Sequence, residues 1–553
     1  MGAIVWWWLA MAHAANLESV LSSELERATS VFALQPEPVH YVALEAEDRW
    51  EFSVRASDGV LAQSRESHQR TLDVDLRVGT PELDSTHPLR GFSSLESDNR
   101  DLVFLPIDDA EFALRHAVAR ELDRAYRSEA EKIVMIRGER SVKADEEVLA
   151  PDFEARPPIQ ARVEVPELSV DRKHWEVLLS ELSAQVERSE VVFESNLSLT
   201  GGRSQTLFLD SAGTRIEQGR TSVRLSASLQ AIADDGDVVE VFDAFDAHSF
   251  ESIPDEPAIR AWIVKLLDRL EALRKAPRGS PYSGPVLLTG RASAVLFHEV
   301  FGHRVEGHRQ KRETEGRTFG EYIGQSLLPS NLDVYDDPTV QKWGSVELNG
   351  TYAYDDEGVP AQRAVLVEDS IFRGFLMSRS PLPDFPHSNG HGRRQTGAPA
   401  LARMGNTIVE AKEGLPRAKM RAMLVSEAKK QGLPYGILVE DIEGGFTLTG
   451  RVEPNSFNVR ANTTWKVFVD GRPDELIRGI DLVGTPLVAF NQLIAAGDDP
   501  EVFNGYCGAE SGWVPVSGVA PSVLFRRLEF QLKEKGQERP PLLSKPITRL
   551  EGT

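Results

Sequence analysis

Residues Val286 to His308 read VLLTGRASAVLFHEVFGHRVEGH, an apolar run that leads directly into a histidine-glutamate pair. Zinc peptidases carry the motif His-Glu-x-x-His, in which two histidines four residues apart share one helix face. Here His298 and His303 are five residues apart, which puts them about 140° apart around a regular α-helix. We therefore expect either that the helix ends or bulges between them, with Gly302 supplying the conformational freedom, or that they do not bind one metal.

The residues around this pair allow more than one chemistry. Glu299 lies four residues before His303 and can face the same side, a position suited to a general base acting on a metal-bound water. The run from His303 to Glu306 is alternatively a cap or a salt-bridge arrangement on a turn, and His308 is typical of a surface or helix-end histidine. A catalytic zinc needs three protein ligands and an open position. Cys507, the only thiol of the chain, would complete a sensible His/His/Cys set, although a single cysteine is also typical of an inert buried residue.

A second polar cluster lies in the Gly- and Pro-rich segment PHSNGHGRRQTGAPALARMGN. It contains His387, His391, Arg393 and Arg394. Two interpretations stay open, a flexible surface loop or a substrate-binding segment. In the second, an extended peptide adds to a sheet edge and the two arginines pair with a carboxylate of the substrate.

Length and composition limit the class of protein. A chain of 553 residues is too long for one ordinary core, so two or three domains are expected. Hydrophobic residues at 41% and charged residues at 27% are typical of a soluble globular protein. The 85 acidic residues against 62 basic ones give a net charge of −23, which argues against nucleic acid or an anionic membrane as partner. One cysteine excludes an intramolecular disulfide, a zinc ribbon and a CxxC redox site.

The N-terminus contains a short apolar run, IVWWWLAM from Ile4 to Met11, followed by the cleavage-like triplet Ala12-His13-Ala14. Residues 1–15 are therefore a candidate signal peptide, and export to the periplasm stays open. No lysine or arginine precedes the run, however, and the run is short for a signal peptide. No other segment approaches the roughly 18 apolar residues that a membrane-spanning helix needs.

Periodicity along the chain predicts an α+β fold. Residues 39–78 alternate as strands do, with a turn at Ser57-Asp58-Gly59. Helices are predicted over 108–139, 171–187 and 255–275, with short strands between the last two that end near Asp246. The breaker cluster APRGSPYSGP marks the main boundary, beyond which the chain is Gly-rich and strand-rich.

We therefore predict helices and sheet in the N-terminal half and a β-rich, Gly-rich catalytic C-terminal domain. The predicted units are the candidate signal peptide (1–15), an N-terminal α+β domain (16–150), a central α+β domain (151–280) and the C-terminal domain (281–553).

Four segments, in order between about Gly284 and Leu528, carry a resemblance to the TldD/PmbA metalloprotease family. HEVFGHRVEG resembles its His-Glu-x-x-x-His signature, and NGTYAYDDEGVPAQRAVLVEDSIFRGFL resembles its DDEG-type block. NGHGRR and ARMGNT resemble its Gly-Asn-Gly-Arg-Arg and Arg-Met-x-Asn-Thr blocks. YCGAESGWVPVSGVAPSVLF resembles its Cys-Gly, Val-Pro-Val and Gly-Gln-Pro segment, with Ala520 where the family often has glutamine. The N-terminal half matches mainly in its order of elements.

The resemblance implies that His298, His303 and Cys507 are zinc ligands, that Glu299 is the general base, and that the five-residue spacing is the family's own. It implies a catalytic TldD-type peptidase that takes peptides or unstructured segments into an enclosed cavity. It also implies a cytoplasmic protein, as a homodimer or a heterodimer with a PmbA/TldE-like subunit.

Two other functions remain open. The first is a non-catalytic assembly subunit with a structural metal site, which four protein ligands would favour over three. The second is a thiol protease, in which Cys507 is the nucleophile and a histidine is the base.

Overall fold

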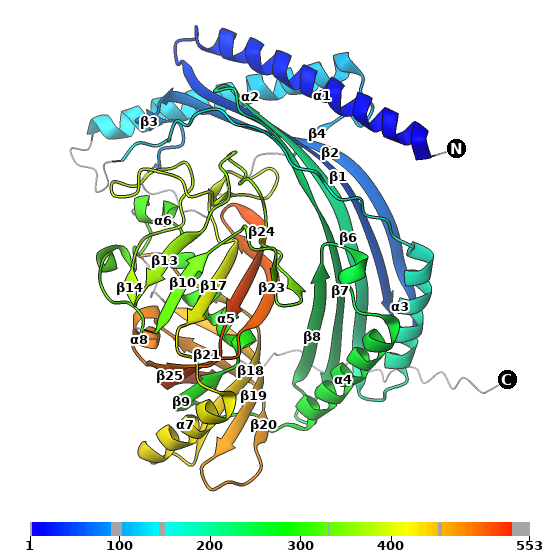
Figure 1. Ribbon diagram of the computed structural model, residues 1–553, viewed down its shortest axis with the longest axis vertical. Coiled ribbons are helices and arrows are strands. Elements are labelled where there is room, and N and C mark those ends of the chain that lie inside the picture. Colours follow the sequence, from blue (N-terminus) through cyan, green and yellow to red (C-terminus); the bar gives the residue numbers. More distant parts are fainter. Residues whose placement is uncertain are drawn as a thin grey trace, which may run out of the picture.

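The N-terminal half contains one long, curved sheet with helices on its outer face (Figure 1). The computed structural model describes residues 3–89, 102–142, 150–312, 314–329, 331–451 and 456–533. The strands of the curved sheet are β1 (Val39–Ser57), β2 (Val60–Thr80), β3 (Leu83–Asp84), β4 (Val103–Leu105), β5 (Gln160–Arg162), β6 (Val192–Asp210), β7 (Arg215–Ile232) and β8 (Val238–Ala247). Their order is β3-β2-β1-β6-β7-β5, with β4 beside β2 and β8 beside β7.

The first hairpin shows how the sequence determines the sheet. Strands β1 and β2 pair along nearly their whole length, and the turn between them is the predicted one. Asp58 and Gly59 have φ angles of 51° and 80°, the left-handed conformation that a two-residue hairpin turn requires. Along β1, Val42, Leu44 and Ala46 face the helices, so the residues between them face the other way, toward the C-terminal half.

Four helices cover the outer face. They are α1 (Ala3–Phe32), α2 (Glu111–Val142), α3 (Arg172–Glu187) and α4 (Glu256–Lys275). The last three confirm the predicted helices. Asp171 and Asp255 are the N-caps of α3 and α4, and each carboxylate accepts a hydrogen bond from a backbone N–H of the first turn. Helices α1 and α2 share one apolar core with β1 and β2, and α3 and α4 share another with β6 and β7.

The curved sheet runs across the predicted boundary at residue 150. Strand β1 belongs to the first predicted domain and β6 to the second. The two strands pair with each other from Ala43 opposite Asp210 to Ala56 opposite Leu197. The division into domains stays a prediction.

The C-terminal half is rich in strands, as predicted, and contains two sheets. One contains β10 (Leu332–Asp336), β13 (Ala364–Glu368), β14 (Ile371–Phe372), β17 (Asn406–Ala411), β23 (Glu501–Ala509) and β24 (Gly512–Ala520). The other contains β9 (Tyr282–Leu288), β18 (Tyr435–Thr447), β19 (Phe457–Phe468), β20 (Glu475–Ile477), β21 (Ile480–Gly484), β22 (Leu493–Ala496) and β25 (Val523–Leu532). Two short pairs are β11 (Lys342–Trp343) with β12 (Val346–Glu347) and β15 (Gly392–Arg393) with β16 (Leu401–Ala402).

The topologies of the two sheets differ. The first is open, in the order β14-β13-β10-β17-β24-β23, so β23 is an edge strand. In the second, the pairs β18–β9, β9–β25, β25–β21, β21–β19 and β19–β18 close on themselves as a five-stranded barrel. Helix α5 (Gly290–Val300) packs between them, against β18 of the barrel and β24 of the open sheet. The remaining helices are α6 (His308–Lys311), α7 (Arg417–Lys430) and α8 (Pro486–Phe490), with 3-10 turns η1 (Phe250–Ser252), η2 (Gly302–Arg304) and η3 (Gly320–Tyr322).

The candidate signal peptide, residues 1–15, lies outside the residues whose side chains the structure describes. In the described parts of the chain, no helix combines the length and the apolar character needed to cross a membrane.

Candidate metal centre

Helix α5 carries the first histidine of the motif and ends before the second. The helix stops at Val300, and the chain passes into the 3-10 turn η2. The predicted break between His298 and His303 is therefore confirmed. Their imidazole rings have centroids 5.1 Å apart and planes at 80° to each other, so both rings face one space although their spacing does not fit a regular helix.

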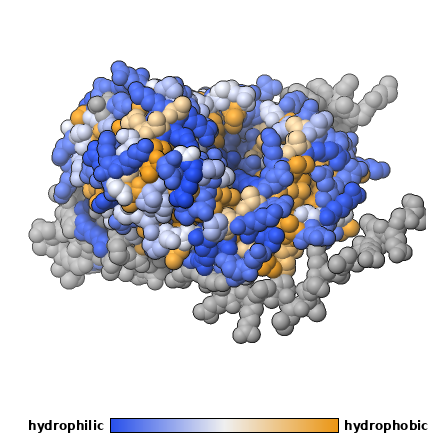
Figure 2. All heavy atoms as spheres, turned by 90° about the horizontal axis from the view of Figure 1, so that it is seen from below, coloured by the Kyte–Doolittle hydropathy of each residue, from blue (hydrophilic) through white to orange (hydrophobic). Residues whose placement is uncertain are grey.

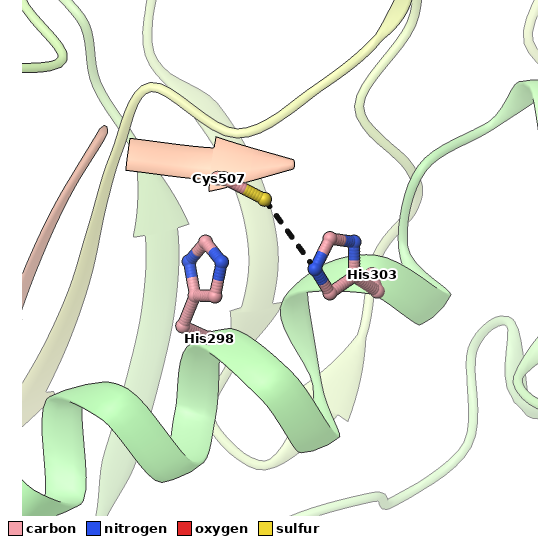
Figure 3. A group of neighbouring side chains, drawn as sticks. All are labelled: His298, His303 and Cys507. Carbon is pink, nitrogen blue, oxygen red and sulfur yellow. Dashed lines mark hydrogen bonds between the residues drawn. The ribbon is translucent and has the colours of Figure 1, made fainter. Parts of the chain in front are cut away.

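Cys507 completes this group from a distant part of the chain. It lies on β23, and its side chain projects toward both histidines (Figure 3). Its Sγ lies 3.4 Å from Nε2 of His303. One ligand atom from each of His298, His303 and Cys507 lies within 4.8 Å of the others, and all three residues are buried. The structure thus brings together the three residues that the resemblance implied as ligands.

The donor set fits a zinc ion. Two imidazole nitrogens and one thiolate are the ligand types that zinc takes in proteins. Within the described residues, no fourth histidine, cysteine, aspartate or glutamate joins the group. Three protein donors with a fourth position open to water or substrate are typical of catalytic sites, whereas structural sites have four.

The three side chains polarise one another. Burial would raise the pKa of Cys507, but His303, His298 and Arg403 hold it well below its ordinary value. Burial alone would lower the pKa of each histidine. The neighbouring Cys507 raises the pKa of His298, and Cys507 and Glu306 together raise that of His303, so both values lie above the ordinary one. The group therefore favours a thiolate, the form in which cysteine binds a metal.

Two charged residues behind the ligands were not predicted as part of the site. Glu306 lies 3.3 Å from Nδ1 of His303, and Arg403 Nη2 donates to Sγ of Cys507 at 3.1 Å and to its carbonyl oxygen at 2.8 Å. Both are fully buried. The sequence allowed a salt bridge for Glu306, which lies one helical turn after His303. Arg403 follows from no local pattern, because its partner is 104 residues away.

A further arginine links this pair to the turn between β23 and β24. Arg309 lies 2.9 Å from Glu306 and makes a two-pronged ion pair with Glu510, at 2.8 and 2.9 Å. Arg309, which also lies 3.0 Å from Glu315, is itself buried. Arg309 thus joins three carboxylates, those of Glu306, Glu315 and Glu510, in one buried network.

Glu299 occupies a different environment from the ligands. It is half-buried, and in the described chain its carboxylate has no hydrogen bond or ion pair. A methyl group added at Gly445 would lie 3.2 Å from Cγ of Glu299, so the barrel hairpin β18–β19 passes close beside it. The charge of the Glu299 carboxylate contributes to raising the pKa of His298.

The predicted polar loop is packed against the N-terminal sheet. The guanidinium of Arg393 donates to the carbonyl of Met404 and lies 4.8 Å from the ring centre of Tyr352. Arg394 lies 3.5 Å from Glu45 and 3.8 Å from Asp73, both on the curved sheet. Substrate binding by the two arginines stays a prediction, and these internal partners argue against it.

The other histidines lie outside the group. His308 begins helix α6, as a helix-end residue, but it is buried and burial lowers its pKa to about 3. His391 is fully buried 3.2 Å from Asp336, and His387 is exposed 2.9 Å from Glu154.

A buried group of two histidines and one cysteine with a half-buried glutamate beside it is the arrangement typical of one class of protein, the metal-dependent hydrolases. Residues 281–532 match the family model described as "PmbA/TldA metallopeptidase C-terminal domain". The resemblance to the TldD/PmbA family is therefore confirmed. The matched region contains His298, Glu299, His303 and Cys507.

Individual proteins agree with this assignment. A "Metalloprotease" of Methanothermobacter thermautotrophicus is 26% identical over 350 residues, which are 61% of this chain and 69% of that protein. A "Zinc metalloprotease TldD homolog" of Saccharolobus solfataricus is 22% identical over 312 residues, 55% of this chain and 64% of that protein. The crystal structure of TldE from Thermococcus kodakarensis has the same fold, with a TM-score of 0.59 at 12% identity over 93% of this chain and 100% of that chain.

Proposed function

We propose that this protein is a zinc-dependent peptidase in which His298, His303 and Cys507 hold the metal and Glu299 is the general base. The observation that carries the proposal is the convergence of these donor types from two distant segments, with three candidate ligands among the residues that the structure describes. The alternative of a structural site would need a fourth. When bound, zinc supplies Lewis acidity that activates water and polarises a peptide carbonyl.

The residues of the chain would divide the remaining work. Glu299, adjacent to a ligand and half-buried, accepts the proton of the attacking water and returns it to the leaving amine. Glu306 holds the imidazole of His303 by Nδ1, so that Nε2 faces the thiol. Glu299 is half-buried and so stays reachable by substrate, whereas the three ligand residues are buried.

An extended peptide is the substrate that this geometry supports. Strand β23, which carries Cys507, is the edge of its sheet, and no strand of the described chain pairs with its outer side. A peptide can add there by backbone hydrogen bonds, with little demand on its sequence. Strand β23 faces the curved sheet, because Arg224 of β7 lies 5.6 Å from the ring centre of Tyr506. A hollow between the two halves is visible from below (Figure 2), which supports a partly enclosed cavity that folded proteins would not enter.

The test is hydrolysis of an unfolded polypeptide, such as reduced and carboxymethylated casein, by the purified protein. We expect a chelator to abolish hydrolysis and stoichiometric zinc to restore it. Activity that persists in the metal-free protein, and that iodoacetamide then removes, would instead assign the thiol-protease mechanism. Since Cys507 lies 3.4 Å from His303, that mechanism is the second candidate.

The assembly is also a proposal. We expect a dimer, either of two copies or with a TldE-like subunit, because a solved TldE shares the fold over almost the whole chain. Light scattering on the purified chain alone distinguishes the two, since only a homodimer forms without the second subunit.

A further inference from the structure

Four side chains form a closed ring of contacts beside the proposed metal position. Starting at His303, Nδ1 lies 3.3 Å from Glu306, whose Oε1 lies 3.2 Å from Nε of Arg403. Nη2 of Arg403 lies 3.1 Å from Sγ of Cys507, and this Sγ lies 3.4 Å from Nε2 of His303. We call these four residues the support ring. It joins the turn η2, the segment between β16 and β17, and strand β23.

Burying the two charged members of the support ring is energetically unfavourable, and packing alone does not explain why charged residues occupy these positions. Glu306 and Arg403 are each 0% exposed. Moving such groups out of water is unfavourable by several kcal/mol per ion, and an apolar pair of the same size is often as stable or more stable. Their partners are also specific, because each charge contacts one of the proposed ligands directly.

Each charged residue fixes one property of its ligand. An acceptor at Nδ1 of His303 keeps the proton on that nitrogen and leaves the lone pair of Nε2 facing the site. One nitrogen of Arg403, Nη2, donates to both the carbonyl oxygen and the sulfur of Cys507, which fixes the rotation of the side chain about Cα–Cβ. The Nε of the same planar guanidinium faces Glu306. Both ligands are thus held in the orientation that a shared ion requires.

We propose that Glu306 and Arg403 are positioning residues that assemble His303 and Cys507 into a metal site before the ion binds. This inference rests on the proposed zinc site, but it does not depend on peptide hydrolysis. It adds to that site two residues that touch neither metal nor substrate.

The experiment measures zinc affinity, by competition with a chromophoric chelator, in wild type and in Arg403→Met. Loss of a residue that orients a metal ligand typically weakens binding by about 10- to 100-fold, and we expect a decrease in this range. The matched control is Arg379→Met. Arg379 is also buried, at 3% exposed. It donates hydrogen bonds to Tyr41 and to the carbonyl oxygen of Glu154, neither of which is a proposed ligand. Arg379→Met should lose stability but keep wild-type zinc affinity.

Two further variants separate orientation from folding. Arg403→Lys keeps a buried positive charge. A lysine ammonium, however, has a single nitrogen and cannot contact Glu306 and Cys507 from two nitrogens in one plane, as the guanidinium does, so the zinc affinity should still fall. Glu306→Gln keeps an acceptor for Nδ1 of His303 and should weaken zinc less than Glu306→Leu does. In the cobalt-substituted protein, the sulfur-to-cobalt charge-transfer band should shift in both Arg403 variants and stay unchanged in Arg379→Met.

The outcomes are distinct. Wild-type zinc affinity in both Arg403→Lys and Glu306→Leu, with an unchanged cobalt spectrum in Arg403→Lys, would overturn the positioning role and leave the proposed function standing. If Arg403→Met does not fold, Arg403→Lys decides the question. Absence of zinc binding by the wild type would instead refute the proposed function, and this inference with it.

Discussion

Cys507 shows how a single side chain takes its chemistry from its surroundings. Composition alone is equally consistent with an inert buried cysteine, and the residue is indeed buried. Its neighbours decide otherwise, because two histidines and Arg403 hold its pKa well below the ordinary value in spite of burial. These neighbours lie 104 to 209 positions before Cys507 in the sequence, so no local pattern could connect them with it. Composition suggested Cys507 as a third ligand because it is the only thiol, and the resemblance implied the same set.

The first prediction concerns the ligands. His298→Ala, His303→Ala and Cys507→Ala should each reduce bound zinc below one ion per chain, because two donors hold an ion much more weakly than three. Elemental analysis of the dialysed proteins gives the stoichiometry. His387→Ala, which changes an exposed histidine outside the group, is the control and should keep the wild-type zinc content. Full occupancy in Cys507→Ala would remove the thiol from the ligand set.

The second prediction separates the base from the ligands. Glu299→Gln should keep zinc, because the three donors remain, and should lower hydrolysis by about 10²- to 10⁴-fold, the usual contribution of a positioned acid–base group. An amide of the same shape can hydrogen-bond water but cannot take its proton. Zinc content and hydrolysis are measured on one sample. Loss of zinc would make Glu299 a ligand or a support for one, and near-normal hydrolysis would exclude it from the mechanism.

At the scale of elements, the break after α5 is the feature that sequence predicted well. The five-residue spacing predicted the break for the case that both histidines bind one metal. The expected conformational freedom of Gly302 is not used, because its φ is not positive. The packing around the break was not predicted. Arg304 donates to the carbonyl oxygens of Glu299 and Val300 and so satisfies the end of the helix. Met404, from a loop about 100 residues later, packs against Gly302 so closely that an added methyl would lie 2.0 Å from its sulfur. Tertiary packing of this kind leaves no local signal.

The third prediction follows from this contact. Gly302→Ala should destabilise the protein by about 1–3 kcal/mol, the usual cost of overpacking a buried site, and should lower its zinc affinity because His303 must shift. Gly138→Ala is the control. Its methyl meets nothing within 4 Å on helix α2, so it should be neutral or stabilise by up to about 1 kcal/mol. Urea unfolding of the metal-free proteins gives both values. Equal stability of the two variants would show that the side chain of Met404 moves aside with no loss of folding free energy.

At the scale of the whole molecule, buried polar contacts of arginine side chains join the two halves. Arg394 pairs with Glu45, and Arg379 donates to Tyr41 at 2.9 Å, in each case between the C-terminal half and β1. The fold class and most N-terminal helices were predictable from periodicity, because each depends on neighbours in sequence. These contacts join residues more than 300 positions apart, and this is why the polar loop around Arg394 was open to interpretation as a surface segment.

The fourth prediction concerns pH. Burial raises the pKa of Glu45 to about 8, against the attraction of Arg394, from the ordinary value of 4.5. Between these values the folded protein holds more protons than the unfolded chain, so the free energy of unfolding falls as the pH rises. Glu45→Gln removes this contribution. Its stability relative to wild type should therefore increase from about pH 4.5 to about pH 8 and then level off.

The measurement is the urea midpoint of both proteins across this pH range. Glu51→Gln, on the same strand but 48% exposed at its side chain, is the control and should show no such trend relative to wild type. A difference between Glu45→Gln and wild type that does not change with pH would show that Glu45 is ionised in the folded protein throughout.

The separation of the ligands along the chain has a consequence for biosynthesis. Cys507 follows His303 by 204 residues, so a ribosome adding about 5–20 residues per second exposes the two histidines roughly 10 to 40 s before it makes the thiol. Helix α5 also packs against β24, which is translated later still. At the proposed site, metal loading would therefore follow translation of the last strands, and the nascent chain would pass through an interval in which the two proposed histidine ligands have no third ligand.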